Sequence, residues 1–313
     1  MNKIILAVVG VSLLVLGCNS KKARDKYTDT PTTGKVAIAV DETFQPIIEA
    51  ELQVFHAIYR YASIKPKYLP EVDVFNLLLH DSVRLAIVSR PLNTKEKNYF
   101  HSRKFFPKEI PVAVDGIAVL VNPSNPDTLF SIIQLRKIMM GEITDWKQIN
   151  PRSKLGEIRV IFDNPNSSTV RFVVDSITKT QKLGKQLSAM QYNIDVADFI
   201  SKTPNAIGLM GISWISNSRD PKSLSFLKKV KVAGISTLDP PTPENSYQPF
   251  QAYIATGKYP LTRFVYMILT EPRAGLGTGF TSFVASDKGQ RIILKTGILP
   301  YVEPVRIVNV KEE

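Results

Sequence analysis

Short runs of consecutive apolar residues alternate along this chain with segments in which apolar residues recur every three or four positions. The first run covers residues 36–40, and after a four-residue turn apolar positions follow at helical spacing from Phe44 to Tyr59. A continuous apolar run is typical of a strand buried on both faces of a sheet, whereas a period near 3.6 residues indicates a helix. The pattern therefore predicts a strand, a turn and a helix.

The same alternation continues downstream. Further strands are expected at residues 85–88, 112–121 and 158–162, and helices at 72–79, 94–101, 132–140 and from 169 through 177. Such alternation predicts an α/β fold with helices on both faces of mostly parallel sheets. In these sheets ligands bind beyond the carboxyl ends of the strands, against helix N-termini.

Three predicted strand-to-helix turns form a candidate ligand site. They cover residues 41–44, 89–92 and 164–169, and each contains hydroxyl, amide or guanidinium groups. Each also leaves free backbone N–H groups at a helix start. Since Ser and Thr commonly cap helices, capping alone is the simpler interpretation of any single turn. The prediction of a site depends on all three turns converging.

The first eighteen residues have the pattern of an export signal. Lys3 precedes an apolar run over residues 4–16, which is shorter than the roughly 20 residues of a membrane-spanning helix. The sequence then resembles a bacterial lipoprotein signal, which implies that Gly17 is the last residue removed and that Cys18 carries lipid. An ordinary secretory signal is the alternative. Cys18 is the only cysteine, so an intrachain disulfide is excluded.

The composition narrows the classes of function. The chain has 313 residues and a formal net charge of +12. An export signal and the lack of a dense basic block argue against a nucleic-acid partner, while a positive field attracts small anions. The three histidines lack metal-ligand spacing, and no nucleophile motif is present. No metal, no cofactor and no enzymatic activity are therefore expected, and the glycine-rich stretch 275–279 is interpreted as a flexible lead-in to the last helices.

Several motifs occur in the order found in one known family. These are Thr43-Phe44, Ser89-Arg90-Pro91-Leu92, Gly141-Glu142-Ile143-Thr144-Asp145-Trp146 with Asn150-Pro151, Ser167-Ser168-Thr169, and Gly297-Ile298-Leu299-Pro300. Through these motifs the chain resembles the phosphate-binding proteins that serve as substrate-binding proteins of bacterial ABC transporters. The resemblance extends from Val36 to about Tyr301.

The resemblance implies a two-lobed periplasmic binding-protein fold of type II, with a two-strand hinge near residues 115–121 and 260–268. The predicted division is a signal peptide 1–17, a flexible lipid-anchored tether 18–34, lobe 1 over 35–116 plus 264–313, and lobe 2 over 117–263. The implied ligand-binding residues are Thr43, Phe44, Ser89, Arg90, Asn166, Ser167, Ser168, Thr169 and Arg171. We expect Arg90 and Arg171 to grip the anion from opposite lobes through forked hydrogen bonds.

Two acids depart from the family pattern. Asp41 and Glu42 stand in a turn that is small and neutral in the family, and the arginine that often precedes the Ser-Gly-Thr turn is absent, with Asp163 near its place. Two unit charges 4 Å apart interact by about 4 kcal/mol at an effective dielectric of 20. Either the acids point away and cap the helix, or an arginine neutralises them, or one accepts the proton of hydrogen phosphate and so excludes sulfate.

Two interpretations of function remain open. The first is a monomeric solute-binding lipoprotein, anchored at the membrane outside the cytoplasm, that captures phosphate or a related oxyanion between its lobes for an ABC permease. The second is an envelope sensor or interaction module that uses the same fold without transport.

Overall fold

The structure is a computed structural model that describes residues 29–302. The predicted signal peptide, Cys18 and residues 19–28 of the predicted tether lie outside the described residues. Residues 29–34 are held on the body of the protein, because Asp29 accepts hydrogen bonds from Arg273 Nη2 at 3.1 Å and Leu276 N at 2.6 Å. The expectation of a flexible tether is therefore wrong for these six residues.

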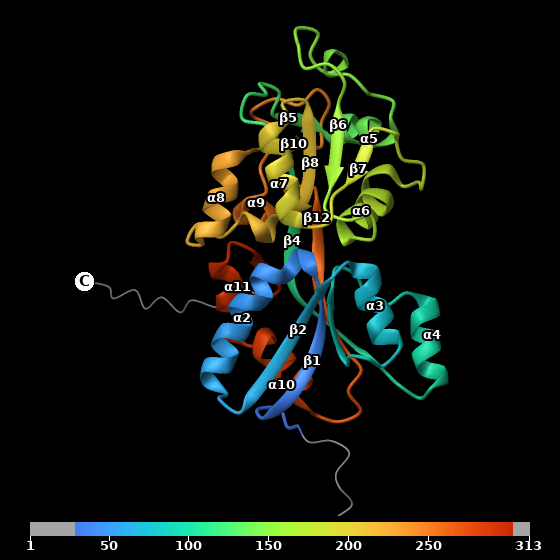
Figure 1. The fold of residues 1–313 in the computed structure, drawn as a ribbon, viewed down its shortest axis with the longest axis vertical. Coiled ribbons are helices and arrows are strands. Elements are labelled where there is room, and N and C mark those ends of the chain that lie inside the picture. Colours follow the sequence, from blue (N-terminus) through green and yellow to red (C-terminus); the bar gives the residue numbers. More distant parts are fainter. Residues whose placement is uncertain (1–28, 303–313) are drawn as a thin grey trace, which may run out of the picture.

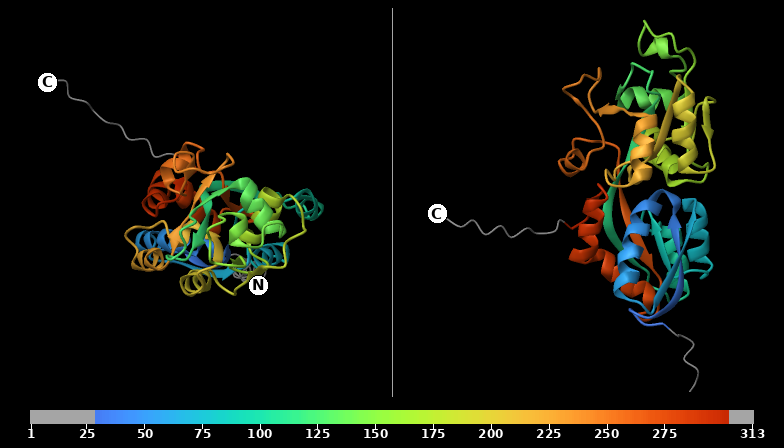
Figure 2. Two further views of the ribbon diagram at one scale, coloured as in Figure 1. Left: turned by 90° about the horizontal axis from the view of Figure 1, so that it is seen from above. Right: turned by 60° about the vertical axis from the view of Figure 1, so that its left-hand side comes forward.

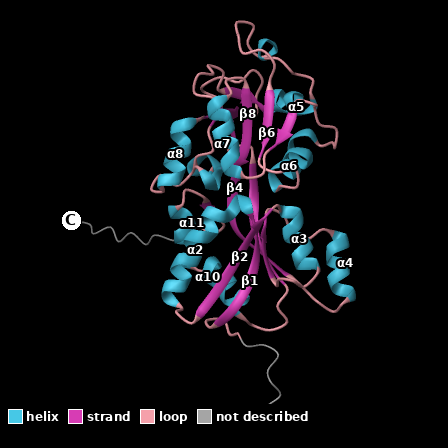
Figure 3. Cartoon of the chain, in the orientation of Figure 1, coloured by secondary structure: helices cyan, strands magenta, loops and turns pink. Residues whose placement is uncertain are grey.

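Two α/β lobes are joined by two long antiparallel strands, β4 (Lys108–Val121) and β12 (Thr262–Leu269), which run from one lobe toward the other (Figure 1). One continuous path of strands, in the order β2-β1-β3-β12-β4-β8-β6-β7, connects the lobes through β4. Helices cover both faces of the sheets (Figure 3). The predicted α/β fold with a two-strand hinge is confirmed.

Lobe 1 contains the first strands and the last helices of the described chain. Its strands are β1 (Gly34–Asp41), β2 (Ala62–Leu69), β3 (Leu85–Val88) and β13 (Leu299–Pro300), and its helices are η2 (Glu42–Phe44), α2 (Gln45–Ile58), α3 (Glu71–Leu79), α4 (Thr94–Ser102), α10 (Leu276–Ala285) and α11 (Asp287–Lys295). Strand β1 pairs in parallel with β2 and β3, and of these three strands the apolar runs predict β1 and β3.

Lobe 2 contains the central part of the chain. Its strands are β5 (Leu129–Ser131), β6 (Arg159–Phe162), β7 (Leu187–Ala189), β8 (Ala206–Gly211), β9 (Lys231–Val232), β10 (Gly234–Ser236) and β11 (Ser246–Tyr247), and its helices are α5 (Ile132–Met140), η3 (Trp146–Gln148), α6 (Ser168–Phe172), η4 (Val173–Thr178), η5 (Ile212–Trp214), α7 (Asn193–Lys202), α8 (Pro221–Lys229) and α9 (Gln251–Ala255). Figure 2 shows the two lobes end to end, with β4 and β12 between them.

Gly275, Gly277 and Gly279 lie at the start of α10 rather than in a flexible segment. The Glu271 carboxylate accepts hydrogen bonds from the backbone N–H groups of Gly275, Gly277 and Thr278 at 3.2, 3.0 and 2.8 Å. A carboxylate at this end of a helix satisfies N–H groups that have no partner within the helix. The interpretation of residues 275–279 as a flexible lead-in is therefore wrong.

The two tryptophans occupy different environments. Trp146, in the motif that the sequence singled out, is fully buried in lobe 2 and donates through Nε1 to the carbonyl of Asn205 at 2.9 Å. Trp214, at the end of η5, lines a small pocket of about 220 Å³ together with Pro46 and Gln53 of α2. Trp214 therefore lies where lobe 2 meets lobe 1.

Within residues 29–302, none of the helices combines the length and the apolar character needed to cross a membrane.

Candidate functional site

The three predicted turns meet where the lobes face each other. Arg171, in α6 of lobe 2, donates through Nη2 to the Ser89 hydroxyl at 2.6 Å, just past the end of β3. Arg263 of β12 lies with its guanidinium carbon 5.2 Å from the ring centroid of Phe44 and donates to Ser168 at 2.8 Å. Side chains from η2, the turn after β3, α6 and a hinge strand are thus brought together.

Arg263, which is not among the predicted residues, lies at the centre of this site. Its Nε donates to Asp115 Oδ2 at 2.9 Å, and its Nη1 donates to the Ser168 hydroxyl. The Arg263 side chain is only 4% exposed, and its Nη2 has no hydrogen-bond partner within the described chain. A buried donor left unpaired costs about 1–3 kcal/mol or more, so this nitrogen favours an acceptor.

Three further polar atoms beside this centre lack partners among residues 29–302. They are the hydroxyl of Thr43, Oδ2 of Asp41 and Oδ1 of Asp115, and all three residues are buried. Thr43 comes close to lobe 2, because a Cβ placed on Gly211 would overlap its Cγ2 atom and lie 3.1 Å from Arg263 Nη2. The site therefore offers a guanidinium, two hydroxyls and a carboxylate around one point between the lobes.

Asp41 caps the turn after β1 while remaining in the site. Its Oδ1 accepts from the backbone N–H of Thr43 at 3.1 Å, which is the capping role that the first of the three alternatives proposed. Burial first, and then the negative charge of Glu71, raise the pKa of Asp41 to about 7 against the opposing effect of Arg263. A carboxyl with this pKa exchanges its proton near neutral pH.

Glu42 contacts the other lobe. Its two carboxylate oxygens accept from the backbone N–H of Asn193 at 3.3 Å and from the Asn193 side-chain amide at 3.1 Å. Asn193 begins α7, whose preceding residue provides no side-chain cap, so Glu42 satisfies a free N–H group of that helix. Burial raises the pKa of Glu42 to about 7.

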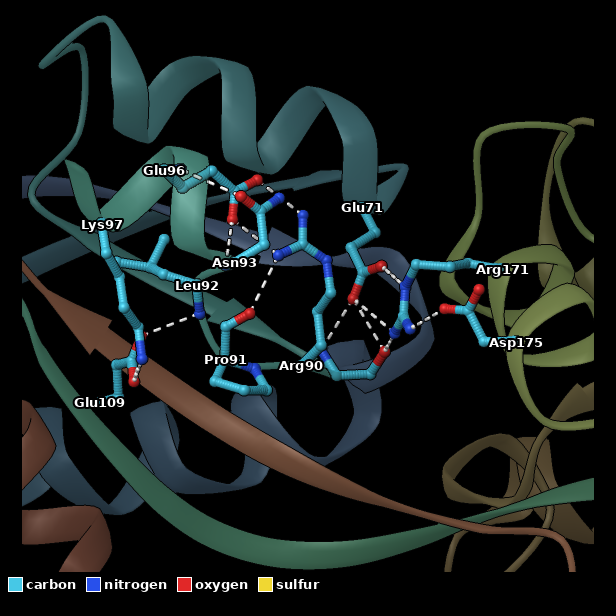
Figure 4. A network of polar contacts seen from close by, with 11 residues as sticks. Glu71, Arg90, Pro91, Leu92, Asn93, Glu96, Lys97, Glu109, Arg171 and Asp175 are labelled. Carbon is cyan, nitrogen blue, oxygen red and sulfur yellow. Dashed lines mark hydrogen bonds and ion pairs between the residues drawn. The ribbon is translucent and has the colours of Figure 1, made fainter. Parts of the chain in front are cut away.

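Arg171 reaches across the lobes, as expected, but its main partner is a carboxylate of the protein. Its Nε donates to Glu71 Oε2 at 2.5 Å, and Nη1 donates to Asp175 at 3.1 Å (Figure 4). Burial opposes ionisation of Glu71, yet the Arg171 guanidinium holds the pKa of that carboxyl below its usual range. Ser89 also donates to Glu71, through its N–H at 2.9 Å and its hydroxyl at 2.8 Å.

Arg90 does not face Arg171. Its guanidinium forms a two-pronged ion pair with Glu96, with both distances 2.8 Å (Figure 4). It also stacks on Phe75, 3.7 Å from the ring centroid, and both contacts lie within lobe 1. The expectation that Arg90 and Arg171 grip an anion from opposite lobes is therefore corrected for Arg90. The same geometry leaves no role for Arg90 in neutralising Asp41 or Glu42.

The turn before α6 is held by a second internal carboxylate. Asp163 accepts from the hydroxyls of Ser167 at 2.6 Å and Thr169 at 3.2 Å, and burial raises its pKa. Asn166 is exposed and contributes its backbone carbonyl to Val72 of lobe 1 at 3.4 Å. Of the predicted hydroxyl donors in this turn, Ser168 alone contacts Arg263.

Sequence reasoning missed Arg263, Asp115 and Glu71. A signal for Arg263 exists, because it lies two residues before Val265 and four before Met267, on the buried side of the same strand. A charged residue in phase with buried apolar positions needs a buried partner. Asp115, directly opposite on β4, is that partner.

An apolar groove lies away from this site. It has a volume of about 530 Å³ and is lined by residues such as Ile212, Leu227 and Phe250, with no charged side chain. Small inorganic anions require donors or cations, so this groove does not suit them.

The fold and this inter-lobe arrangement define a two-lobed α/β binding protein. Residues 25–288 match the model of the PBP superfamily domain, and the chain belongs to that family. The chain is similar to the phosphate-binding protein PstS of Staphylococcus saprophyticus, with 24% identity over 90% of this chain and 84% of the relative. It is also similar to PstS of Staphylococcus haemolyticus, with 24% identity over 90% of this chain and 87% of the relative.

Solved structures share the fold. A substrate-binding protein from Clostridium perfringens, solved with bound phosphate, superposes with a TM-score of 0.72 at 20% identity, over 86% of this chain and all of that one. An ABC-type phosphate transport receptor from Vibrio cholerae superposes with a TM-score of 0.63 at 20% identity, over 85% of this chain and all of that one.

Proposed function

We propose that this protein is an extracytoplasmic solute-binding protein that captures phosphate, or a related inorganic oxyanion, between its lobes for uptake by an ABC permease. The relatives that bear the name PstS, and the fold shared with phosphate-bound proteins, support the ligand class. The observation that carries the proposal within this chain is the buried, partly unpaired guanidinium of Arg263 beside Thr43 and Ser168.

In the proposed mechanism, Arg263 supplies the positive charge that was expected from Arg90. Its free Nη2 and the hydroxyls of Thr43 and Ser168 donate to the anion oxygens, while Asp115 fixes the guanidinium plane. Asp41 Oδ2 accepts the proton of hydrogen phosphate, the third of the alternatives for the acids. Sulfate carries no such proton and would face this carboxylate without a hydrogen bond, which disfavours it.

Isothermal titration with phosphate tests the proposal. Arg263→Lys keeps a positive charge beside Asp115 but loses the forked geometry, and loss of one or two charge-assisted hydrogen bonds weakens binding by about 10- to 100-fold. Arg90→Lys is the matched control, and its affinity stays at the wild-type value. Equal affinities for wild-type protein and Arg263→Lys, or an absence of phosphate binding by wild-type protein, contradict the assignment.

We further propose that Cys18 carries the lipid that holds the protein at the membrane and that the protein catalyses no reaction. Radiolabelled palmitate fed to cells producing the protein should enter the wild-type chain and not Cys18→Ser. Incorporation of palmitate into both proteins, or into neither, contradicts the proposed lipid attachment at Cys18.

One observation favours the alternative function, an envelope sensor or interaction module. Four of the predicted anion donors already bond to carboxylates of the protein, Ser89 and Arg171 to Glu71, and Ser167 and Thr169 to Asp163. Thermal-shift measurements with phosphate, arsenate, sulfate and molybdate separate the two functions, because only a ligand that binds the native state raises its stability. The absence of a shift with every anion favours the alternative.

A further inference from the structure

The carboxylate of Glu71 is bound as an external oxyanion would be bound. Glu71 begins α3 of lobe 1, and its side chain is 3% exposed. Its Oε1 accepts from the N–H and the hydroxyl of Ser89, and its Oε2 accepts from Arg171 Nε. A backbone N–H, a hydroxyl and a guanidinium are the donor types expected to hold an anion at the end of a strand.

The donors of this carboxylate come from both lobes. Ser89 follows β3 of lobe 1, whereas Arg171 belongs to α6 of lobe 2, and Arg171 Nη2 also donates to the Ser89 hydroxyl at 2.6 Å. Figure 4 shows the Arg171 side chain extending from its own lobe to Glu71. The Glu71–Arg171–Ser89 cluster therefore forms the same bridge that an anion bound between the lobes would form.

A second bridge has the same polarity. Glu42 of lobe 1 accepts two hydrogen bonds from Asn193 of lobe 2. Lobe 1 thus presents carboxylates to donors of lobe 2 at two places. Both contacts exist only while the lobes face each other closely.

We propose that Glu71 latches the lobes closed when no anion is bound, through a bridge between the lobes that is separate from the anion site at Arg263. Opening of the hinge would separate Arg171 from Glu71 and break their ion pair. The inference goes beyond the proposed function, because the latch operates whatever the ligand is and even if there is none.

Distances between spin labels on the two lobes test the latch. The only native cysteine is Cys18, so Cys18→Ser allows labels at Lys65→Cys in lobe 1 and Lys154→Cys in lobe 2, both exposed positions. The labelled protein with no latch substitution should give one short distance in the absence of ligand. Phosphate should change this distance by less than about 2 Å, which is the smallest change expected for a domain rearrangement. In the same background, Glu71→Gln should give a longer and broader distribution.

Glu96→Gln is the matched control, because it removes the charge from an arginine pair of 2.8 Å that lies within lobe 1. Its distances should equal those of the wild-type background. If circular dichroism shows that Glu71→Gln does not fold, Arg171→Gln replaces it in the experiment. This variant removes the more exposed partner of the pair and should also lengthen the distance. An open wild-type background, or unchanged distances in the folded latch variant, overturns the proposal.

Phosphate titration of the same samples separates this inference from the proposed function. If the protein is closed without ligand and does not bind phosphate, the latch is supported and the proposed function is contradicted. If the protein is open without ligand and closes when phosphate is added, the latch is contradicted and the proposed function is supported.

Discussion

Arg263 and Asp115 lie directly opposite each other on the two hinge strands, with Arg263 Nε 2.9 Å from Asp115 Oδ2. Their side chains are 4% and 0% exposed. Burial raises the pKa of Asp115, and the Arg263 guanidinium opposes the rise. The strands that connect the lobes therefore hold the central cation of the candidate site through a buried ion pair.

Removing one partner of this pair should destabilise the protein strongly. In Asp115→Ala the Arg263 charge stays buried without compensation, and we expect a loss of about 3–5 kcal/mol in the free energy of unfolding. Urea denaturation measures this loss. The control is Asp287→Ala, which breaks an exposed pair with Arg291 and should change stability by less than about 1 kcal/mol. Equal effects of the two variants would show that the hinge pair is not a structural anchor.

Asp41→Asn should reduce discrimination between phosphate and sulfate. The amide replaces an acceptor that has no partner in the described chain with a group that can donate to sulfate. The ratio of phosphate to sulfate affinity should fall by about tenfold or more, since leaving a buried polar group unpaired accounts for discrimination of this size. Competitive titration of both anions gives the ratio, and an unchanged ratio removes Asp41 from the selectivity mechanism.

Glu51 should make stability depend on pH. It is fully buried in α2, neither of its oxygens has a partner in residues 29–302, and burial raises its pKa from 4.5 to about 9. A carboxyl with a raised folded pKa stabilises the native state fully below pH 4.5, and this contribution is lost as pH rises toward 9, by up to about 1.4 kcal/mol per pH unit. Thermal melts of wild-type protein and Glu51→Gln between pH 5 and 9 should show a flatter profile for the variant.

Glu49→Gln is the control for this experiment, because Glu49 is exposed on the same helix. Its profile should follow that of the wild-type protein. A Glu51→Gln profile as steep as the wild-type one would mean that other groups cause the pH dependence.

Gly211→Ala should hold the lobes apart. A Cβ at residue 211 of lobe 2 would overlap the side chain of Thr43 in lobe 1, so the closed contact cannot form unchanged. Small-angle X-ray scattering should give a larger radius of gyration, and phosphate affinity should fall. Gly116→Ala, whose Cβ would make only ordinary contacts of 3.4 Å or more, should retain the wild-type radius. A Gly211→Ala protein as compact as the wild type contradicts this reading of the contact.

Much of the fold follows from the spacing of apolar residues. The expected helix at 132–140 coincides with α5, which ends at Gly141 with a positive φ of 77°. The expected strands at 85–88 and 158–162 correspond to β3 and β6, with β6 beginning one residue later. These elements are predictable because local burial decides them.

The arrangement of charges was less predictable. Arg90 and Arg171 have the same side chain, yet Glu96, six residues from Arg90, pairs with the first, and Glu71, a hundred residues from Arg171, pairs with the second. Which carboxylate reaches which guanidinium depends on how the lobes meet, and periodicity does not contain that information. The three turns were identified locally, whereas Arg263 contributes to the site from a strand far along the chain.

The position of Trp214 makes the intrinsic fluorescence of the protein sensitive to the contact between the lobes. The chain has two tryptophans, and Trp146 is fully enclosed in lobe 2, whereas Trp214 shares its pocket with residues of α2 in lobe 1. Movement at the hinge would expose the Trp214 indole to water and leave the Trp146 indole buried. The wavelength of the tryptophan fluorescence would then report opening of the unlabelled protein in real time, and Trp146 would contribute a constant signal.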